Sequence, residues 1–226
     1  MISIVIPTML IPDGVEERIR TWAKSPFVKE VIVINNTSKK IDFTDEPKIV
    51  YIYEGKNTYI NPAWNKGYML STSDKICFAN DDIDFDVDIF EWIEPLITPD
   101  IGMIGLDEYH GHGVWEDEPG CDRSRPTDKR GKRFPFKLLP IHHRRKPGFA
   151  CIWFIHKSNY KWIPDDLKVF FGDDYVYYEN GKQNYSIQNF DIVGKVGQTT
   201  IKPEINSFMA TDAICWGKYD KKIRRR

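Results

Sequence analysis

The sequence predicts one α/β domain with a mainly parallel central sheet, helices on both faces and a long basic loop insertion. Two observations predict this fold. Short apolar runs alternate with segments of helical periodicity along residues 1–106, and the runs are continuously apolar, as in strands buried on both faces. A length of 226 residues suits one domain that carries a substantial insertion. No apolar run approaches the roughly 20 residues of a membrane span, so we expect none.

The first 106 residues divide into elements in the order βαβ, β, αβ, αβ. The apolar runs predict strands at Ile2–Ile6, Val28–Ile34, Lys48–Tyr53, Ile76–Ala79 and Ile101–Leu106. Helical spacing and start signals predict helices at Val15–Lys24, Asn61–Ser71 and Asp86–Pro95. Asn61 is expected to cap the second helix, with Pro62 at its first position. Alternation of this kind favours a parallel sheet between two layers of helices.

The pattern breaks between residues 107 and 147, which are rich in Gly, Pro, His and charge and show no period. A stretch of this length inside a domain is typical of a lid, a binding loop or disorder. Order resumes with elements expected at Gly148–His156 (strand), Phe171–Asn180 (helix), Tyr185–Val196 (strand) and Glu204–Tyr219 (helix). We therefore divide the single domain 1–226 into a first half, 1–106, a basic loop, 107–147, and a second half with a basic tail, 148–226.

The net charge of -1 hides a strong asymmetry. Residues 1–120 hold 10 basic and 22 acidic residues, whereas residues 121–147 hold 10 and 2 and carry a net +8. Such blocks are often solvated loops and sometimes bind polyanions. The four cysteines lie far apart without a Cys-x-x-Cys pair, which argues against a zinc site and favours free thiols in a reducing compartment. We therefore expect a cytoplasmic protein.

An acidic cluster follows the predicted strand at 76–79. It consists of Asn80, Asp81, Asp82 and Asp84. Ligands of open α/β sheets bind beyond the carboxyl ends of the strands, so this cluster faces the expected site. Neighbouring carboxylates repel each other unless a cation lies between them, and Mg²⁺ or Mn²⁺ favours one or two carboxylates together with substrate phosphates. The alternative is a solvated acidic turn before the next helix.

Other polar features fall at the same predicted edge. The first two strands end in short elbows at Pro7–Thr8 and Asn35–Asn36, and a second acidic pair, Asp173–Asp174, begins a predicted helix. One carboxylate cluster for a metal and another group for a proton is what sugar transfer from a nucleotide diphosphate requires. In the alternative interpretation, Asp173 and Asp174 only favour the helix dipole.

With these motifs in order, the chain resembles the nucleotide-sugar glycosyltransferases of the A-type (GT-A) fold, and within them the family-2-like group of inverting enzymes. The motifs that carry the resemblance are Ile2–Thr8, Val31–Ser38, Asn61–Gly67, Ile76–Asp82 and Gly172–Tyr175. They correspond to the first strand, the second strand with its nucleotide-contacting end, the A-x-N-x-G helix, the D-x-D metal motif and the E-D motif of the catalytic base. The resemblance covers roughly residues 1–106 and 148–200.

The resemblance implies roles for residues at these positions. It implies a divalent cation, Mn²⁺ or Mg²⁺, held by Asp82 with Asp84, and a catalytic base at Asp174 with Asp173 beside it. It implies a nucleotide-sugar donor, for which we favour a UDP-sugar, bound by Pro7, Thr8, Asn35, Asn65, Lys66, Asn80 and Asp81. The chain departs from the family in three places: Asn35 and Asn80 stand where the family has Asp, and residues 190–202 hold no late His for the metal.

The acceptor is predicted from charge. Members of this group act on glycans, lipids, proteins or, in some bacteriophages, hydroxymethylated DNA bases. A block of +8 suits DNA, because phosphate neutralisation supplies most non-specific affinity. We therefore predict a phage-type enzyme that modifies a hydroxymethylated base in duplex DNA, held by Arg123, Arg125, Arg130, Arg133, Arg144, Arg145 and Lys146. A saccharide acceptor is the first alternative, and a non-catalytic polyanion-binding module is the second. A sugar-nucleotide pyrophosphorylase is disfavoured, because residues 7–12 contain no Gly for a phosphate loop.

Overall fold

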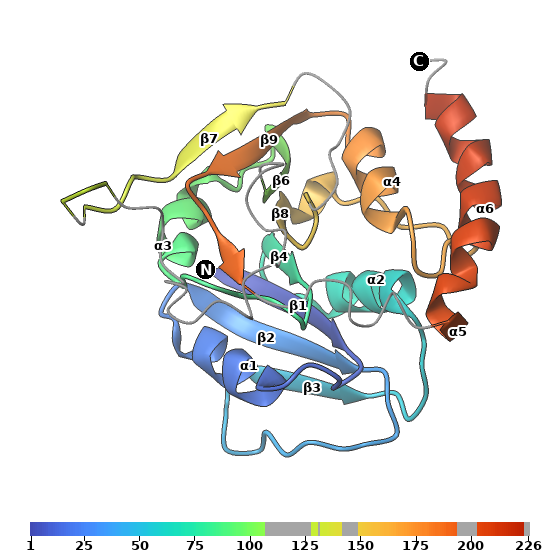
Figure 1. Ribbon diagram of the computed structural model, residues 1–226, viewed down its shortest axis with the longest axis horizontal. Coiled ribbons are helices and arrows are strands. Elements are labelled where there is room, and N and C mark those ends of the chain that lie inside the picture. The colour runs from blue at the N-terminus through green and yellow to red at the C-terminus, as the bar shows by residue number, and fades with distance from the viewer. Residues whose placement is uncertain (107–127, 131, 142–148, 194–202, 224–226) are drawn as a thin grey trace.

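The computed structural model describes residues 1–106, 128–130, 132–141, 149–193 and 203–223. Its centre is an eight-stranded sheet with the order β3-β2-β1-β4-β8-β6-β9-β7 (Figure 1). The strands are β1 Ile2–Thr8, β2 Val28–Asn35, β3 Ile49–Tyr53, β4 Lys75–Ala79, β6 Ile101–Leu106, β7 Lys137–Pro140, β8 Ile152–His156 and β9 Gln183–Gln188. A separate two-stranded ribbon pairs β5 (Asp84–Phe85) with β10 (Ile192–Val193).

The sheet is mainly parallel, as predicted. Strands β3, β2, β1 and β4 form one parallel run, and β6 and β9 pair in parallel with each other. Strand β8 runs antiparallel to both of its neighbours, β4 and β6, and β7 is an antiparallel edge strand against β9. The reversed direction of β8 could not be read from its sequence, because a strand buried on both faces is continuously apolar in either direction.

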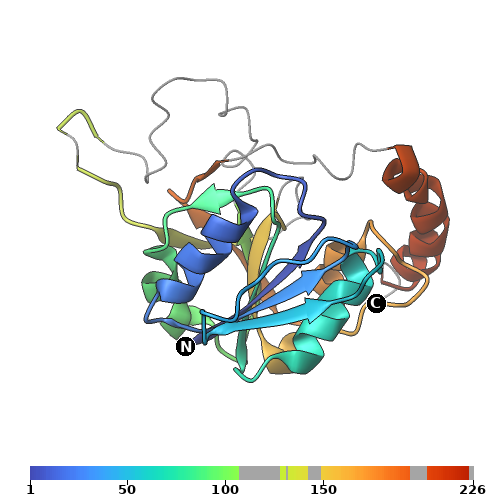
Figure 2. The ribbon, with the colours of Figure 1, turned by 90° about the horizontal axis from the view of Figure 1, so that it is seen from below.

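Helices cover both faces of the sheet. They are α1 Val15–Lys24, α2 Ile60–Leu70, α3 Ile89–Ile93, α4 Gly172–Glu179, α5 Pro203–Asn206 and α6 Phe208–Ile223, with 3₁₀ turns at Glu94–Leu96 and Lys157–Asn159. Alternate residues of β1 enter two different cores: Ile4 packs with α1 and α3, and Val5 packs with α2 and α4. Figure 2 shows α1 and α2 on opposite sides of the sheet. None of the described helices is long and apolar enough to cross a membrane.

Gly67 sets the close approach of α2 to the sheet. A Cβ atom at this position would lie 2.1 Å from Cγ1 of Val5 on β1. Only a residue without a side chain therefore allows this helix to lie where it does. The glycine of the A-x-N-x-G pattern is a packing residue in this protein.

Two predicted helix starts are wrong by a few residues. Helix α2 begins at Ile60, and its N-cap is Tyr59, whose φ of 66° is in the left-handed region. Asn61 lies inside the first turn, and its side-chain amide donates to the carbonyls of Leu167 and Phe170. Helix α3 begins at Ile89 and ends in a 3₁₀ turn at Glu94–Leu96. At α2 the contacts of Asn61 are distant in sequence, which local capping preference cannot reveal, whereas residues 86–88 before α3 form a local turn in which the Asp88 N–H donates to Asp86 Oδ1 at 3.0 Å.

Two strand predictions are also corrected. The segment expected to lack regular structure contains β7, whose four residues are too short to show a period. The single strand expected at Tyr185–Val196 is divided into β9 and β10. Asn189 separates them with a φ of 60°, a conformation that Asn adopts more readily than most residues and that ends a strand.

Candidate functional site

The strand register brings the predicted polar elbows to one edge of the sheet. Thr8 at the end of β1 pairs with Asn35 at the end of β2, and Asn35 pairs with Tyr53 at the end of β3. Helices α2 and α4 each lead into a strand that runs in this same direction, β4 and β9, so their amino-terminal ends lie toward this edge as well. Residues far apart in sequence therefore meet where the fold class predicts a ligand.

Asp81 joins the elbow after β1 to the elbow after β4. Its Oδ2 accepts a hydrogen bond from Thr8 Oγ1 at 2.6 Å and from the Met9 N–H at 3.2 Å. Thr8 Oγ1 in turn accepts from the N–H of Leu10, which has a φ of 54°. Asp81 is buried, so these bonds replace the water that its carboxylate would otherwise hold.

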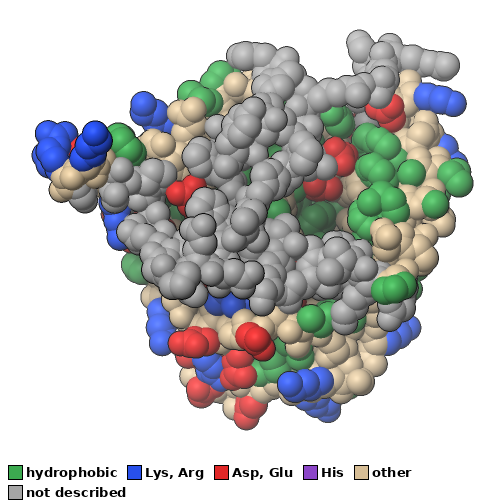
Figure 3. All heavy atoms as spheres, viewed as in Figure 1, with side chains coloured by type: hydrophobic (Ala, Val, Ile, Leu, Met, Phe, Trp, Pro, Cys, Tyr) green, Lys and Arg blue, Asp and Glu red, His purple; other side chains and the backbone are tan. Residues whose placement is uncertain are grey.

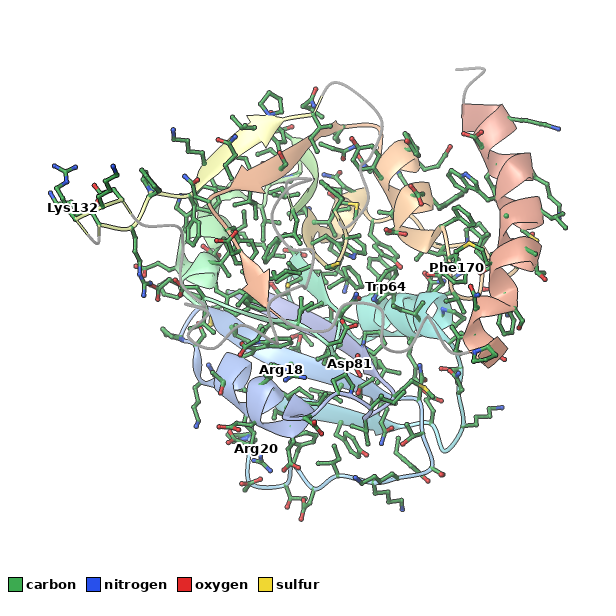
Figure 4. All side chains as sticks on the ribbon, viewed as in Figure 1. Arg18, Arg20, Trp64, Asp81, Lys132 and Phe170 are labelled. Atoms are coloured by element: carbon green, nitrogen blue, oxygen red, sulfur yellow. The ribbon has the colours of Figure 1, made fainter. Side chains whose placement is uncertain are left out.

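Burial raises the pKa of Asp81 to about 6, and the negative charge of Asp82 raises it as well. The hydrogen bonds from Thr8 and Met9 and the charge of Arg18 act in the opposite direction on this pKa. Arg18 projects from α1 and donates to the backbone carbonyl of Asp81 at 2.7 Å (Figure 4). Sequence reasoning missed Arg18, which sits on an otherwise ordinary amphipathic helix.

The predicted metal residues, Asp82 and Asp84, lie at the acidic edge, and their binding of a divalent cation stays a prediction. Asp82 is buried beside Asp81, and Asp84 accepts from the Phe85 N–H through Oδ1 at 2.9 Å. The described residues contain no group of three or more His, Cys, Asp or Glu that could hold a metal. An ion here would complete its coordination with diphosphate oxygens and water, as Mg²⁺ and Mn²⁺ commonly do. Burial first, and the charge of Asp82 second, disfavour the ionised form of Asp81 at this place.

Asn35 shapes the loop after β2. Its Nδ2 donates to the Lys39 carbonyl and to the Tyr51 hydroxyl, both at 2.6 Å. Its Oδ1 accepts from the N–H and the hydroxyl of Thr37, both at 2.9 Å. An Asp at this position would lack the amide N–H that the Lys39 carbonyl accepts from. The next residue, Asn36, accepts from Thr58 Oγ1 at 2.7 Å and ties this loop to the approach to α2.

Asn65, another predicted donor residue, has its side chain held inside the protein, and its contact with a donor stays a prediction. Its side chain is buried and lies against the second half of the chain, where Nδ2 donates to the Ile163 carbonyl at 2.8 Å. Its Oδ1 accepts from the Tyr160 hydroxyl at 2.8 Å and from the Ile163 N–H at 3.0 Å. Both ends of the amide are thus occupied inside the protein, and Asn65 joins α2 to the segment at 160–163.

The other predicted donor residues lie at or near this edge. Pro7 is buried inside β1, and Asn80 is half-buried, with its backbone N–H donating to the Cys151 carbonyl at 3.0 Å. Lys66 is partly exposed on α2 and forms an ion pair with Glu54. Their contact with a donor stays a prediction.

Asp173 and Asp174 lie in the first turn of α4, as predicted, and both are partly exposed. Gly172 begins this helix, and a Cβ atom there would lie 2.1 Å from Oδ1 of Asn61 on α2. The first turns of α2 and α4 are therefore packed directly against each other. Their contact places the predicted catalytic base beside the helix that borders the donor elbows.

Asp212 on α6 was missed by sequence reasoning. It is fully buried, and its carboxylate accepts from the backbone N–H groups of residues 168–170, the segment that leads to α4. A pattern that could have revealed it is the spacing of Phe208, Asp212, Trp216 and Tyr219 along one helical stripe. A lone carboxylate on an otherwise aromatic stripe points to a buried partner.

Only part of the predicted acceptor surface falls on described residues. Arg123, Arg125, Arg144, Arg145 and Lys146 lie outside them. Arg130 pairs with Asp128 at 2.8 Å, and Arg133 pairs with Asp86 at 2.9 Å, just beyond the acidic edge. Figures 3 and 4 show basic side chains, Lys132 among them, at a tip that projects from the body.

Leu106 and Phe149, the described residues that flank 107–148, lie at the same edge of the sheet as the candidate site. The segment leaves from the carboxyl end of β6 and returns just before β8, which runs in the opposite direction. The Leu106 N–H donates to the Phe149 carbonyl at 3.0 Å, so these two residues touch. The chain therefore enters and leaves the segment 107–148 beside the acidic edge.

Comparison with known proteins supports the fold. No protein-family model matches the chain, and no curated protein is similar to it in sequence. Solved structures do match. TarS of S. aureus is 13% identical with a TM-score of 0.56, over 87% of this chain and 37% of TarS. GalNAc-T7, solved with UDP, GalNAc and Mn²⁺, is 11% identical with a TM-score of 0.57, over 97% of this chain and 50% of that one.

A third similar structure is the mannosyltransferase PcManGT from Pyrobaculum calidifontis, in complex with GDP-Man and Mn²⁺. It is 13% identical with a TM-score of 0.57, over 88% of this chain and 57% of PcManGT. The chain thus spans between 37% and 57% of the length of these three proteins. The shared fold is that of the A-type glycosyltransferases, which confirms the predicted fold class.

Proposed function

We propose that this protein is a glycosyltransferase that moves a sugar from a nucleoside-diphosphate donor to an acceptor hydroxyl with inversion. One observation carries the proposal. The A-type fold gathers the elbow of Thr8, the acidic edge from Asp81 to Asp84 and the first turn of α4 at the carboxyl ends of the parallel strands. This is where open α/β sheets bind nucleotides.

The donor would lie across the elbows that follow β1 and β2. Asn35 and Asn36 hold the second elbow in one shape, and Asp81 ties the first elbow to the acidic edge. Such preformed loops cost little reorganisation when a ligand binds. We favour a UDP-sugar as the donor, since similar structures were solved with UDP or GDP-Man.

Asp82, with Asp84 near it, would hold Mn²⁺ or Mg²⁺. When bound, such an ion neutralises charge that develops on the leaving diphosphate. Asp174 takes the proton of the acceptor hydroxyl as that oxygen bonds to the anomeric carbon, and the bond to the diphosphate breaks on the opposite side. Direct displacement with one base inverts the anomeric configuration. Asp173, next to Asp174, adds negative charge where the proton arrives.

The proposed acceptor is a hydroxymethylated base in duplex DNA, supported by the +8 charge of residues 121–147. One observation favours the alternative, a saccharide acceptor. Arg130 and Arg133 already pair with carboxylates of this chain, so they have less charge to offer a phosphate backbone. Phosphate contacts would then come from the remaining predicted residues, Arg123, Arg125, Arg144, Arg145 and Lys146.

The activity is tested by incubating the protein with a panel of nucleotide sugars, with Mn²⁺ or with EDTA. A glycosyltransferase is expected to bind one donor, raise its own melting temperature and hydrolyse that donor slowly with Mn²⁺. A polyanion-binding module would show no donor binding, no rise in melting temperature and no donor hydrolysis, and that result would reject the proposal.

The acceptor is tested by binding to duplex DNA over a salt series. Each phosphate contact contributes roughly -0.9 to the slope of log K against log salt. Replacing Arg144, Arg145 and Lys146 by Ala is expected to flatten the slope by about two to three units. A slope that the triple variant leaves unchanged, or no binding at low salt, would favour the saccharide.

A further inference from the structure

Asp212 forms an unusual contact with the backbone in front of α4. Its Oδ2 accepts from the N–H groups of Val169 and Phe170 at 2.7 and 2.8 Å, and both of its oxygens lie within 3.2 Å of the Lys168 nitrogen. Asp212 is fully buried, and a buried carboxylate costs several kcal/mol unless hydrogen bonds compensate it. The segment 168–170 must therefore keep this turned shape as long as α6 is docked.

The turn leads directly into a strained residue. Phe171 has a φ of 64°, a left-handed conformation that a bulky residue rarely adopts unless its surroundings impose it. The carbonyl of Phe171 accepts the first hydrogen bond of α4, from the Tyr175 N–H at 2.9 Å. Its ring stacks on Trp216 of α6, with ring centroids 5.8 Å apart and planes 4° from parallel. Helix α6 thus holds Phe171 through its side chain and through the backbone before it.

Helix α2 holds the same turn from the other side. The Asn61 side chain donates to the carbonyls of Leu167 and Phe170, both at 3.2 Å, and its backbone N–H donates to the Lys168 carbonyl at 3.2 Å. Gly172 lies directly against Asn61. The start of α4 is therefore held between α2, through Asn61, and α6, through Asp212 and Trp216. We call these contacts the clamp.

We propose that Asp212 is a positioning residue that holds Asp174 in place to accept the proton of the acceptor. The inference rests on the proposed function, in which Asp174 is the base. A general base acts only within hydrogen-bond reach of its proton, and a displacement of about 1 Å can cost on the order of 100-fold in rate. Because Asp212 is fully buried and its carboxylate is bonded to the backbone of residues 168–170, it acts through the turn at 168–172.

The test replaces Asp212 by Asn, which keeps the shape and removes the charge. Glu30→Gln is a matched control, because Glu30 is also buried and its Oε1 also accepts three hydrogen bonds, from Ser3 Oγ and from the N–H and hydroxyl of Thr72. These groups lie toward the amino ends of β1 and β4, at the edge opposite the site. A loss caused by lower stability alone should appear in both variants.

Each change is made alone and together with Asp174→Asn, and hydrolysis of a UDP-sugar is measured with Mn²⁺. Asp212→Asn is expected to lower kcat by about 10- to 100-fold while the affinity for UDP stays within about twofold. In the Asp174→Asn background it is expected to have no further effect, whereas Glu30→Gln acts equally in both backgrounds. An equal loss from Asp212→Asn in both backgrounds, or a loss of UDP affinity, would overturn the proposal.

Amide hydrogen exchange tests whether Asp212 holds the turn at 168–172, and it does not depend on enzymatic activity. Asp212→Asn is expected to speed exchange at residues 168–170 and in the first turn of α4, and Glu30→Gln is not; unchanged exchange would also overturn the proposal. If Asp212→Asn does not fold, Trp216→Leu loosens the same turn and should show the same dependence on Asp174. Wild-type protein that neither binds UDP nor hydrolyses any donor would reject the proposed function itself, whatever exchange shows at the clamp.

Discussion

Replacing Asp81 by Asn is expected to change how the stability of the protein depends on pH. The native pKa of Asp81 is about 6, raised mainly by burial from an ordinary value of 3.8. A carboxyl whose pKa is raised on folding binds more protons in the native state between these two values. Stability therefore falls as pH rises through this window. A shift of about two units corresponds to about 3 kcal/mol lost between pH 4 and pH 7.

The Asn side chain cannot ionise, so the variant lacks this loss. Its carbonyl can still accept from Thr8 and Met9, and any fixed cost of the substitution is the same at every pH. We therefore expect the stability of Asp81→Asn, measured relative to wild type, to rise by about 3 kcal/mol from pH 4 to pH 7. The test depends on how the difference in free energy of unfolding between the two proteins changes with pH, and not on the size of that difference at one pH.

The assay is urea denaturation at several pH values in EDTA, because a bound cation would stabilise the carboxylate and reduce the effect. Asp100→Asn, at an exposed turn, is the control and should show a flat difference. A flat difference for Asp81→Asn would refute the reasoning, as would a variant that becomes relatively less stable with rising pH. Adding Mn²⁺ should shrink the difference if an ion binds beside Asp81.

Three further predictions concern the reaction and the packing. Asp82→Asn should lower donor hydrolysis by orders of magnitude with an unchanged circular dichroism spectrum, and activity in EDTA equal to that with Mn²⁺ would contradict a metal role. Asp174→Asn should abolish transfer to the acceptor, leave a low but measurable rate of donor hydrolysis and keep UDP affinity in calorimetry, whereas a retained anomeric configuration in the wild-type product would exclude single displacement. Gly67→Ala should destabilise the fold by about 1–3 kcal/mol or more in urea, since the new methyl would meet Val5. Gly217→Ala, with open space around it, should be neutral or stabilising, and equal losses in both would remove the packing argument.

Periodicity and composition predicted the layers of this fold well. Helix α1 runs from Val15 to Lys24 as expected, because its apolar spacing is local information. The parallel run of β1, β2 and β4 followed from the alternation of strands and helices. The direction of β8 was not predictable, since it depends on which sheet edge the chain returns to after residues 107–148.

The candidate site was predicted as a set of chain segments rather than as contacts. The joining of Thr8 to Asp81 followed from strands that end at one edge. The roles of Asn65 and Asp212 depend on partners about 100 and 40 residues away, at Ile163 and Lys168. Polar residues in helix interiors have no local pattern that names such partners, so their roles required the structure.

The hydrogen bond between Leu106 and Phe149 has a consequence for engineering. These two residues flank 107–148 and already touch, so replacing the segment between them by a short turn removes loop length without pulling on β6 or β8. Such a deletion takes away β7, which leaves β9 as the new edge of the sheet. Under the proposed function, in which this segment holds the acceptor, grafting it between related proteins exchanges acceptor preference while the elbows after β1 and β2 and the acidic edge stay in place.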